Sequence, residues 1–129
     1  LFYRNSAVRL GVDVSDGTSN TLAIGERAAA FARVPWVGAV TNGTVRTTPD
    51  APVYESGVQP AMAMPLARVG WKPLNDPWSK PHDFFGVHPG GVPFVFGDGA
   101  VHFLKPTLDV RIFQALATRN GGEANVNWE

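Results

Sequence analysis

The stretch from Phe94 to Leu104 constrains the fold more than any other part of this sequence. Its apolar residues alternate on both sides of the dipeptide Asp98–Gly99, which tolerates the positive φ angles of a two-residue hairpin turn. With that turn, Phe96 lies opposite Val101, and period-two alternation assigns one face to Phe94, Phe96, Val101 and Phe103. The opposite face then carries Val95, His102 and Leu104. The sequence therefore predicts an antiparallel hairpin whose aromatic face must be covered.

The segment after this hairpin is the natural cover for the aromatic face. Apolar residues recur there at helical spacing: Leu108, Ile112, Phe113 and Leu116. Thr107 is the predicted amino-terminal cap, with Asp109 in the first turn, where a carboxylate suits the helix dipole. Asn120–Gly121–Gly122 supplies the stop. We expect an amphipathic helix over residues 107–119, and a helix packed on one side of a mainly antiparallel sheet makes a loop-rich α+β fold.

Weaker signals mark the elements before this hairpin. Leu22–Gly25 is an apolar run of strand length. Ala28–Val34 is rich in alanine and favours one or two helical turns. Trp36–Val40 and Thr44–Thr48 flank Asn42–Gly43, which is typical of a second hairpin.

Proline dominates the middle of the chain. Eight of the eleven prolines lie between residues 35 and 81, so residues 49–81 are not expected to form a central strand. We expect a surface excursion that Trp71 and Trp78 pin to the body. Residues 1–129 as a whole have the length of a single globular domain.

Composition and motifs exclude several classes of protein. Eleven Lys and Arg balance eleven Asp and Glu, which disfavours a nucleic-acid binder because phosphate contacts need cationic side chains. The absence of cysteine excludes disulfide scaffolds and thiolate zinc sites. The sequence contains no nucleophile elbow, P-loop or dinucleotide fingerprint, and no apolar run approaches the ~20 residues that span a bilayer. We expect a non-enzymatic protein without a cofactor.

Histidines and aspartates near the hairpin suggest a transition-metal site as an alternative. Imidazole and carboxylate groups suit zinc, iron or manganese, and the candidates are His82, Asp83, His88, Asp98 and His102. A metal centred on His88 and Asp98 would indicate a metal-dependent hydrolase. No two of the histidines have helical i, i+4 spacing. The spacing favours a simpler interpretation, in which His88 holds the segment before the hairpin by a hydrogen bond and Asp98 fixes the turn.

A second polar cluster suggests calcium. Its members are Asp13, Ser15, Asp16, Thr18, Asn20 and Glu26. Oxygen ligands at alternate positions of a glycine-containing loop suit a hard cation, and Asp13, Asp16 and Asn20 are the candidate ligands. The order does not match an EF-hand. Local turns in which Asp, Ser and Thr side chains bind the backbone explain the same residues more simply.

Aromatic residues of the proline-rich excursion suggest a ligand site. Trp71, Trp78 and Tyr54 would suit stacking on sugar rings or filling a partner interface. The alternative is that they plug the core. Burial of the rings distinguishes a carbohydrate or surface-ligand module from a structural role.

Two motifs in this chain resemble those of a known family. One motif begins with His88-Pro89-Gly90-Gly91, and nine residues separate His88 from Asp98-Gly99. This pattern resembles the H-X9-DG signature of the prepilin-type DUF1559 family, which is abundant in planctomycete bacteria. A second motif of that family resembles the stretch Asp16-Gly17-Thr18-Ser19-Asn20 together with Gly25-Glu26. Residues 115–123 are similar to the closing helix of the family. Only the proline-rich middle has no counterpart.

The resemblance implies a fold, a location and a class of partner. Members are similar to type IV pilins and pseudopilins, with a cleaved leader, an apolar membrane-anchoring helix and a β-rich head. This implies that the chain is the C-terminal head of a longer exported protein, at the cell surface, in the periplasm or outside the cell. The implied partners are other pilin-like subunits or an assembly resembling type II secretion. The family has no established catalytic residues, so the motif residues carry no assigned role.

Overall fold

The computed structural model describes residues 1–2, 5–28, 66–79, 82–123 and 127–128, together with strand segments between residues 32 and 62. The elements around the core are α1 (Leu10–Asp13), the 3-10 turn η1 (Thr18–Asn20), β1 (Leu22–Gly25), β7 (Val92–Phe96), β8 (Val101–Leu104) and α2 (Val110–Ala117). The strand segments are β2 (Ala32–Arg33), β3 (Ala39–Val40), β4 (Thr44–Arg46), β5 (Val53–Glu55) and β6 (Ala61–Met62). Among the helices of the described residues, none is long and apolar enough to cross a membrane.

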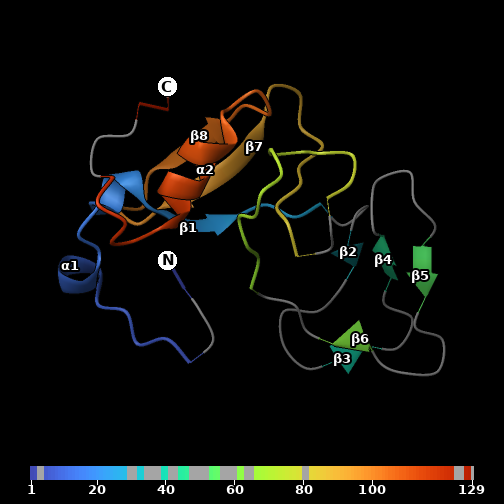
Figure 1. The fold of residues 1–129 in the computed structure, drawn as a ribbon. Helices are drawn as coiled ribbons and strands as arrows, with labels where there is room; N and C mark the ends of the chain where they lie inside the picture. The colour runs from blue at the N-terminus through green and yellow to red at the C-terminus, as the bar shows by residue number, and fades with distance from the viewer. Residues whose placement is uncertain are drawn as a thin grey trace.

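The chain has a small α+β fold, as the sequence predicts. Strands β1, β7 and β8 form an antiparallel sheet with β7 in the centre. Helix α2 lies over one face of this sheet (Figure 1). The predicted strand at Leu22–Gly25, the hairpin of β7 and β8, and the C-terminal helix are all present. The arrangement leaves the second face of the sheet without a covering helix in the described part of the chain.

The turn between β7 and β8 differs from the expected one. The Gly99 N–H donates to the Phe96 carbonyl (3.0 Å), and the Phe96 N–H donates to the Ala100 carbonyl (2.8 Å). The loop therefore contains three residues, Gly97 to Gly99, and ends with Gly99 at φ +90°. This is a recognised hairpin form, in which a glycine in the left-handed region follows the turn as a bulge.

The third loop residue shifts the register by one position. Phe94 lies opposite His102, and Val95 lies opposite Val101. A one-residue shift turns a strand's side chains to the other face, so the prediction that Val101 and Phe103 share the buried face with Phe94 was wrong. Val101 and Phe103 are 60% and 59% exposed, whereas Leu104, expected on the opposite face, is buried.

The core lies between the inner face of the sheet and α2. Its buried members come from β1, β7, β8, α2 and the segment 66–79: Leu22, Leu74, Val92, Phe94, Phe96, Leu104, Phe113 and Leu116. Phe94 packs edge-on against Phe113, with ring centroids 5.7 Å apart, and against Phe84 at 5.0 Å. Edge-to-face aromatic packing of this kind adds to the gain from apolar burial.

Helix α2 is shorter than the predicted 107–119. Its cap is Asp109, whose Oδ1 accepts a hydrogen bond from the Arg111 N–H (2.7 Å). The predicted cap Thr107 instead lies in a turn closed by the Leu108 N–H and the Lys105 carbonyl (3.0 Å). An aspartate binds the free N–H groups of a first turn as well as threonine does, so either residue satisfied the sequence pattern.

Pro93 determines where β1 ends and where the chain goes next. The Glu26 N–H donates to the Pro93 carbonyl (3.3 Å), but proline has no N–H to return to the Glu26 carbonyl. That carbonyl accepts from the Phe85 N–H instead (3.3 Å), and the Ala28 N–H donates to the Phe85 carbonyl (2.8 Å). The chain therefore leaves the sheet at Glu26 and pairs with the segment that precedes β7.

Two predictions for the peripheral strands were wrong. The helical turns expected at Ala28–Val34 are contradicted by β2, which pairs with β4. The strands on either side of Asn42–Gly43 do not pair with each other, because β3 pairs with β6 while β4 lies between β2 and β5. A turn dipeptide permits a hairpin but does not enforce it, since cross-strand partners decide the pairing. The rest of these segments lies outside the described residues.

Candidate functional site

The two motif stretches pack against each other at the end of the sheet. The Gly97 N–H, in the turn of the β7–β8 hairpin, donates to the Thr21 carbonyl (2.8 Å). A Cβ on Gly97 would lie 3.0 Å from the Thr18 carbonyl oxygen of η1. The 3-10 turn and the hairpin turn are therefore in direct backbone contact.

Asp16 binds the chain that follows α2. Its Oδ2 accepts from the Gly121 N–H (2.8 Å) and the Thr118 hydroxyl (3.1 Å), and its Oδ1 accepts from the Gly122 N–H (2.9 Å). The residue is only 2% exposed. Burial alone raises the pKa of the Asp16 carboxyl, but these hydrogen bonds outweigh it, and the pKa is lowered from its usual 3.8. Asp16 thus joins the first motif to the C-terminal segment.

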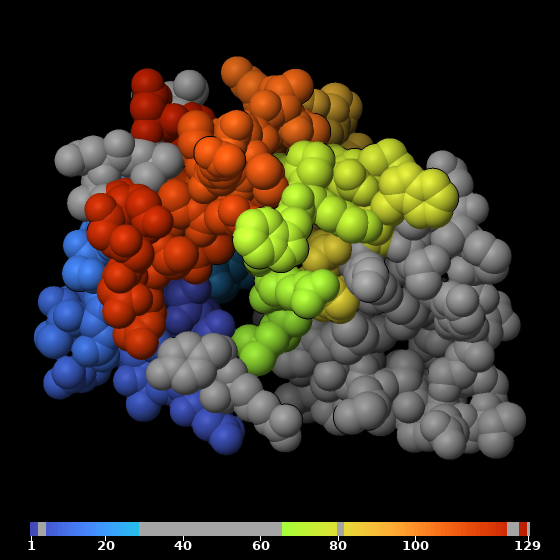
Figure 2. All heavy atoms as spheres, in the orientation of Figure 1, coloured from blue at the N-terminus to red at the C-terminus, as the bar shows by residue number. Residues whose placement is uncertain are grey.

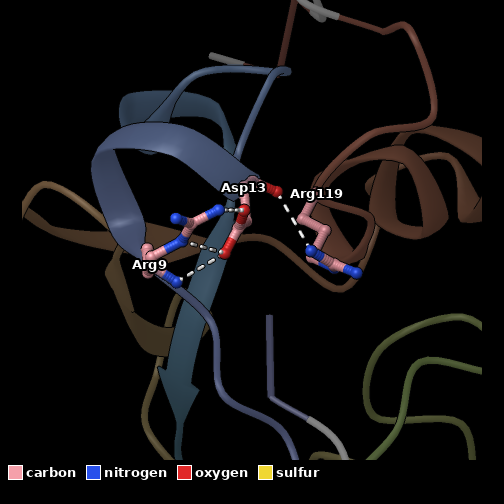
Figure 3. Close-up of polar contacts among 3 residues, drawn as sticks. All are labelled: Arg9, Asp13 and Arg119. Carbon is pink, nitrogen blue, oxygen red and sulfur yellow. Dashed lines mark hydrogen bonds and ion pairs between the residues drawn. The ribbon is translucent and has the colours of Figure 1, made fainter.

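Three further polar candidates near Asp16 have partners within the protein. Asp13 accepts hydrogen bonds from the Arg9 backbone N–H (2.9 Å) and guanidinium (3.0 and 3.2 Å), and the Arg119 guanidinium donates to the Asp13 carbonyl (3.2 Å), as Figure 3 shows. Hydrogen bonds from the Arg9 side chain and backbone lower the pKa of Asp13 from 3.8 to about 2. The Asn20 amide donates to the Asp16 carbonyl (3.2 Å). Ser15 is exposed, and its hydroxyl donates to the Arg119 carbonyl at 3.5 Å.

Asp98 has the local role that its turn position suggests. Its Oδ1 accepts a hydrogen bond from the Ala100 N–H (2.9 Å), and the side chain is otherwise exposed. This contact closes the loop from within, as aspartate does in turns. The carboxylate therefore holds the hairpin turn.

His88 pairs with a residue of the other motif. Its Nε2 lies 3.3 Å from the Glu26 Oε2, and its ring meets the Phe103 ring edge-on, with centroids 6.5 Å apart. No sequence prediction paired these two residues, because 62 positions separate them and no local pattern relates them. Both residues belong to family motifs, which was the one available signal. The pair links the end of β1 to the segment before β7.

The three histidines have different surroundings. His102 lies between Phe96 and Trp128, with ring centroids 5.1 and 4.7 Å away, and the His82 Nε2 lies 3.8 Å from the Asp83 Oδ1. Within the part of the chain that the structure describes, no three His, Asp or Glu side chains gather closely enough to hold a metal ion. Among the candidate carboxylates, Asp13 binds the Arg9 guanidinium, and Asp16 and Asp98 each bind backbone N–H groups.

Two of the motif glycines, Gly25 and Gly91, leave room for close neighbours. A Cβ on Gly25 would collide with the Phe94 ring and approach the Phe84 ring to 2.6 Å. A Cβ on Gly91 would collide with the Leu104 carbonyl oxygen. Ser19, Pro89 and Gly90 are exposed. Gly17 precedes η1, and its carbonyl accepts a hydrogen bond from the Thr21 hydroxyl (3.0 Å). The close approach of strands and rings thus explains Gly25 and Gly91.

The tryptophans of the proline-rich excursion do not pin it. Trp71 and Trp78 are 90% and 74% exposed, which contradicts the predicted anchoring role. Buried Leu74 anchors the segment instead, together with Asn75, whose amide exchanges two hydrogen bonds with the Gly86 backbone (2.8 and 2.9 Å). Figure 2 shows the segment 66–79 in lime and yellow at the surface beside α2. The Tyr54 side chain lies outside the described residues.

The face of the sheet opposite α2 carries a second group of exposed apolar side chains. Ile24, Val101 and Phe103 are 55%, 60% and 59% exposed. Ile24 and Val101 both lie opposite Val95 on the central strand, one on each side, so their side chains share one face. We call Ile24, Val95, Val101 and Phe103 the outer sheet face.

One comparison with known proteins identifies the family. The family described as "Protein of unknown function (DUF1559)" matches residues 1–111. Neither the curated proteins nor the solved structures give a match. The matched range includes β1, the β7–β8 hairpin and both motif stretches, whose contacts organise the sheet. The chain therefore belongs to the DUF1559 family, whose function is unknown.

Proposed function

We propose that this chain is a non-enzymatic assembly domain that acts through protein–protein contacts, in the manner of a pseudopilin head. The observation that carries the proposal is the outer sheet face, whose Ile24, Val101 and Phe103 are each more than half exposed. A sheet face of this composition gains free energy when a partner covers it, because apolar surface leaves water.

The motif side chains support the same proposal. Asp16 holds the C-terminal segment, Asp98 holds the hairpin turn, and His88 pairs with Glu26. These contacts stabilise the sheet that presents the outer face, and they use the polar groups that a catalytic site would need. As in pilin-like proteins, we expect an exported protein anchored through an apolar N-terminal helix, with other pilin-like subunits as partners.

Site-specific photocrosslinking tests this proposal. A benzoylphenylalanine at Phe103 in the full-length protein, expressed in its own host, is expected to give crosslinked products of discrete mass. The matched control is the same residue at Arg111, which is exposed on α2, on the opposite side of the sheet. A full-length protein that is monomeric after extraction and gives no product from Phe103 would contradict an assembly role.

A second candidate function is favoured by one observation. The exposure of Trp71 and Trp78 suits a carbohydrate or surface-ligand module, because exposed indole rings stack on sugar rings. Titration with a panel of soluble oligosaccharides, followed by tryptophan fluorescence, tests it. Binding that Trp71→Ala and Trp78→Ala abolish would support this function, and an unchanged spectrum across the panel would rule it out.

A further inference from the structure

The outer edge of β8 presents unpaired backbone groups. Hydrogen bonds of the β7–β8 hairpin begin at the Phe96 N–H and the Ala100 carbonyl and recur at every second pair in an antiparallel ladder. Pro93 and Gly97 face β1, since the Pro93 carbonyl accepts from Glu26 and the Gly97 N–H donates to Thr21. On β8, His102 and Leu104 therefore face β7. The N–H and C=O groups of Val101 and Phe103 point away from the sheet.

These outward groups have no partner in the described part of the chain. No hydrogen bond to the backbone of Val101 or Phe103 is present beyond the hairpin, and both side chains are about 60% exposed. Natural edge strands are commonly protected by a charged residue, a proline or a bulge. Strand β8, Val101–Leu104, contains neither a charge nor a proline, and His102 is held inward between Phe96 and Trp128. The edge is thus open to a further strand.

We propose that β8 pairs antiparallel with β8 of a second copy of this chain, which joins the two three-stranded sheets into one. This inference rests on the proposed assembly function and names its partner. Around a two-fold axis at His102, Val101 of each copy lies opposite Phe103 of the other. In that register, the outward N–H and C=O groups of Val101 and Phe103 in one copy lie opposite those of Phe103 and Val101 in the other. It also places the apolar side chains of both copies on one continuous face.

Charge favours this orientation. Exposed Asp98 and Lys105 flank the two ends of β8. In the antiparallel pair, Lys105 of each copy lies beside the Asp98–Gly99 turn of the other, so opposite charges meet at both ends. A parallel pair would place Lys105 beside Lys105 and Asp98 beside Asp98. The net charge of zero adds no long-range repulsion between copies.

Cysteine pairing tests the register directly. The chain contains no cysteine, so Val101→Cys and Phe103→Cys proteins carry single thiols. After mild oxidation, a mixture of the two variants is expected to form disulfide-linked dimers much faster than either variant alone. Across the proposed pair these two positions face each other, whereas two copies of the same position are two residues apart. Equal crosslinking in the mixture and in each variant alone would overturn the register.

Proline substitution tests the edge itself. Val101→Pro removes an N–H that points outward and leaves the hydrogen bonds to β7 in place. We expect sedimentation equilibrium to show a dimer for the original chain and a roughly hundredfold weaker one for Val101→Pro, because each copy loses one interface hydrogen bond. Val101→Thr is the matched control and should retain the dimer.

The outcomes separate this inference from the proposed function. A chain that stays monomeric at millimolar concentration, or a mixture of thiol variants that does not crosslink, would overturn self-pairing of β8. Discrete photocrosslinks from Phe103 to a different protein would then still support an assembly role. If Val101→Pro fails to fold, the cysteine mixture decides the question.

Discussion

At the scale of single residues, several family-motif positions are explained by what their side chains contact or by the space that a missing side chain leaves. Asp16 collects two backbone N–H groups and a hydroxyl from the segment after α2. Gly25 leaves room for the Phe94 ring. These residues are far apart in the sequence from the groups they contact. Their roles are those of framework residues, which fix the relative position of the sheet and the C-terminal segment.

Asp16→Asn is expected to lower the free energy of unfolding by roughly 2–3 kcal/mol. The neutral amide oxygen accepts hydrogen bonds less strongly than a carboxylate oxygen, and the amide NH₂ group cannot accept one at all. The lowered pKa of Asp16 stabilises the folded state above pH 3.8, and this contribution is lost as the pH falls through the lowered value. The free energy of unfolding should therefore fall more steeply in acid for the original protein than for the variant.

Urea titrations at several pH values between neutrality and pH 2 check this expectation. Asp13, whose pKa is about 2, titrates in the same acid range in both proteins, so the difference between them reports on Asp16. Asp98→Asn is the matched control, because its amide oxygen still accepts from the Ala100 N–H. Parallel pH profiles for the original protein and Asp16→Asn would refute the assignment.

Gly25→Ala is expected to lower the free energy of unfolding by roughly 1–3 kcal/mol, because the added methyl group collides with Phe94 in the core. Gly11→Ala serves as the control, because a Cβ there has nothing within 4 Å. Thermal unfolding followed by circular dichroism measures both. Equal melting temperatures would show that Gly25 does not sit against the ring.

At the scale of elements, one loop residue decides what the β7–β8 hairpin presents. A two-residue turn at Asp98–Gly99 would have buried Val101 and Phe103. The three-residue loop instead turns both outward and leaves the edge of β8 apolar. The hairpin therefore supplies both half of the core and the surface on which we base the proposed assembly function.

The register has a direct energetic consequence. Leu104→Ala is expected to lower the free energy of unfolding by roughly 2–5 kcal/mol, the usual effect of truncating a leucine that is fully buried. Phe103→Ala should lose less than about 1 kcal/mol, since its ring is more than half exposed. Chemical denaturation of the two variants compares them. The reverse order of stabilities would support the register expected from the turn dipeptide.

The turn glycine offers a separate check on the same element. Gly99 has φ +90°, and a Cβ at this position would have nothing within 4 Å, so any cost of substitution arises from the backbone conformation. Gly99→Val is expected to lower the free energy of unfolding by roughly 1–3 kcal/mol. Gly99→Asn should lower it less, because asparagine tolerates the left-handed region of backbone angles. Melting temperatures of the two variants measure the difference. Equal stability would contradict the bulged turn.

At the scale of the whole molecule, the segment after α2 is held by contacts with the Asp16 loop and with β7. The Asp16 loop binds Gly121 and Gly122, and Trp128 stacks on Phe96 with ring centroids 5.0 Å apart. The C-terminal segment thus covers one end of the sheet, while α2 covers the inner face (Figure 1). Within the described residues, no further element covers the outer face or pairs with the edge of β8.

Two truncations separate these contributions. Removal of residues 124–129 takes away the Trp128 ring and should cost roughly 1 kcal/mol from lost ring stacking. Removal of residues 121–129 also removes the backbone N–H groups that donate to Asp16. We expect this longer truncation to lower the free energy of unfolding by at least about 2 kcal/mol more. Urea unfolding of the two truncated chains measures the difference. Equal stabilities would show that the Asp16 contacts contribute nothing.

Local sequence patterns were sufficient to predict the α+β fold, the presence of β1, of the β7–β8 hairpin and of the C-terminal helix, and the family. The fold and its elements follow from turn chemistry and side-chain periodicity, which act over a few residues, whereas the family follows from the resemblance of the two motifs. The hairpin register, the pairing of Glu26 with His88, the partners of Asp16 and the exposure of Trp71 and Trp78 emerged only from the folded chain. Each depends on which distant segment competes for the same hydrogen bonds or covers the same face, and no local pattern in a single sequence encodes that competition.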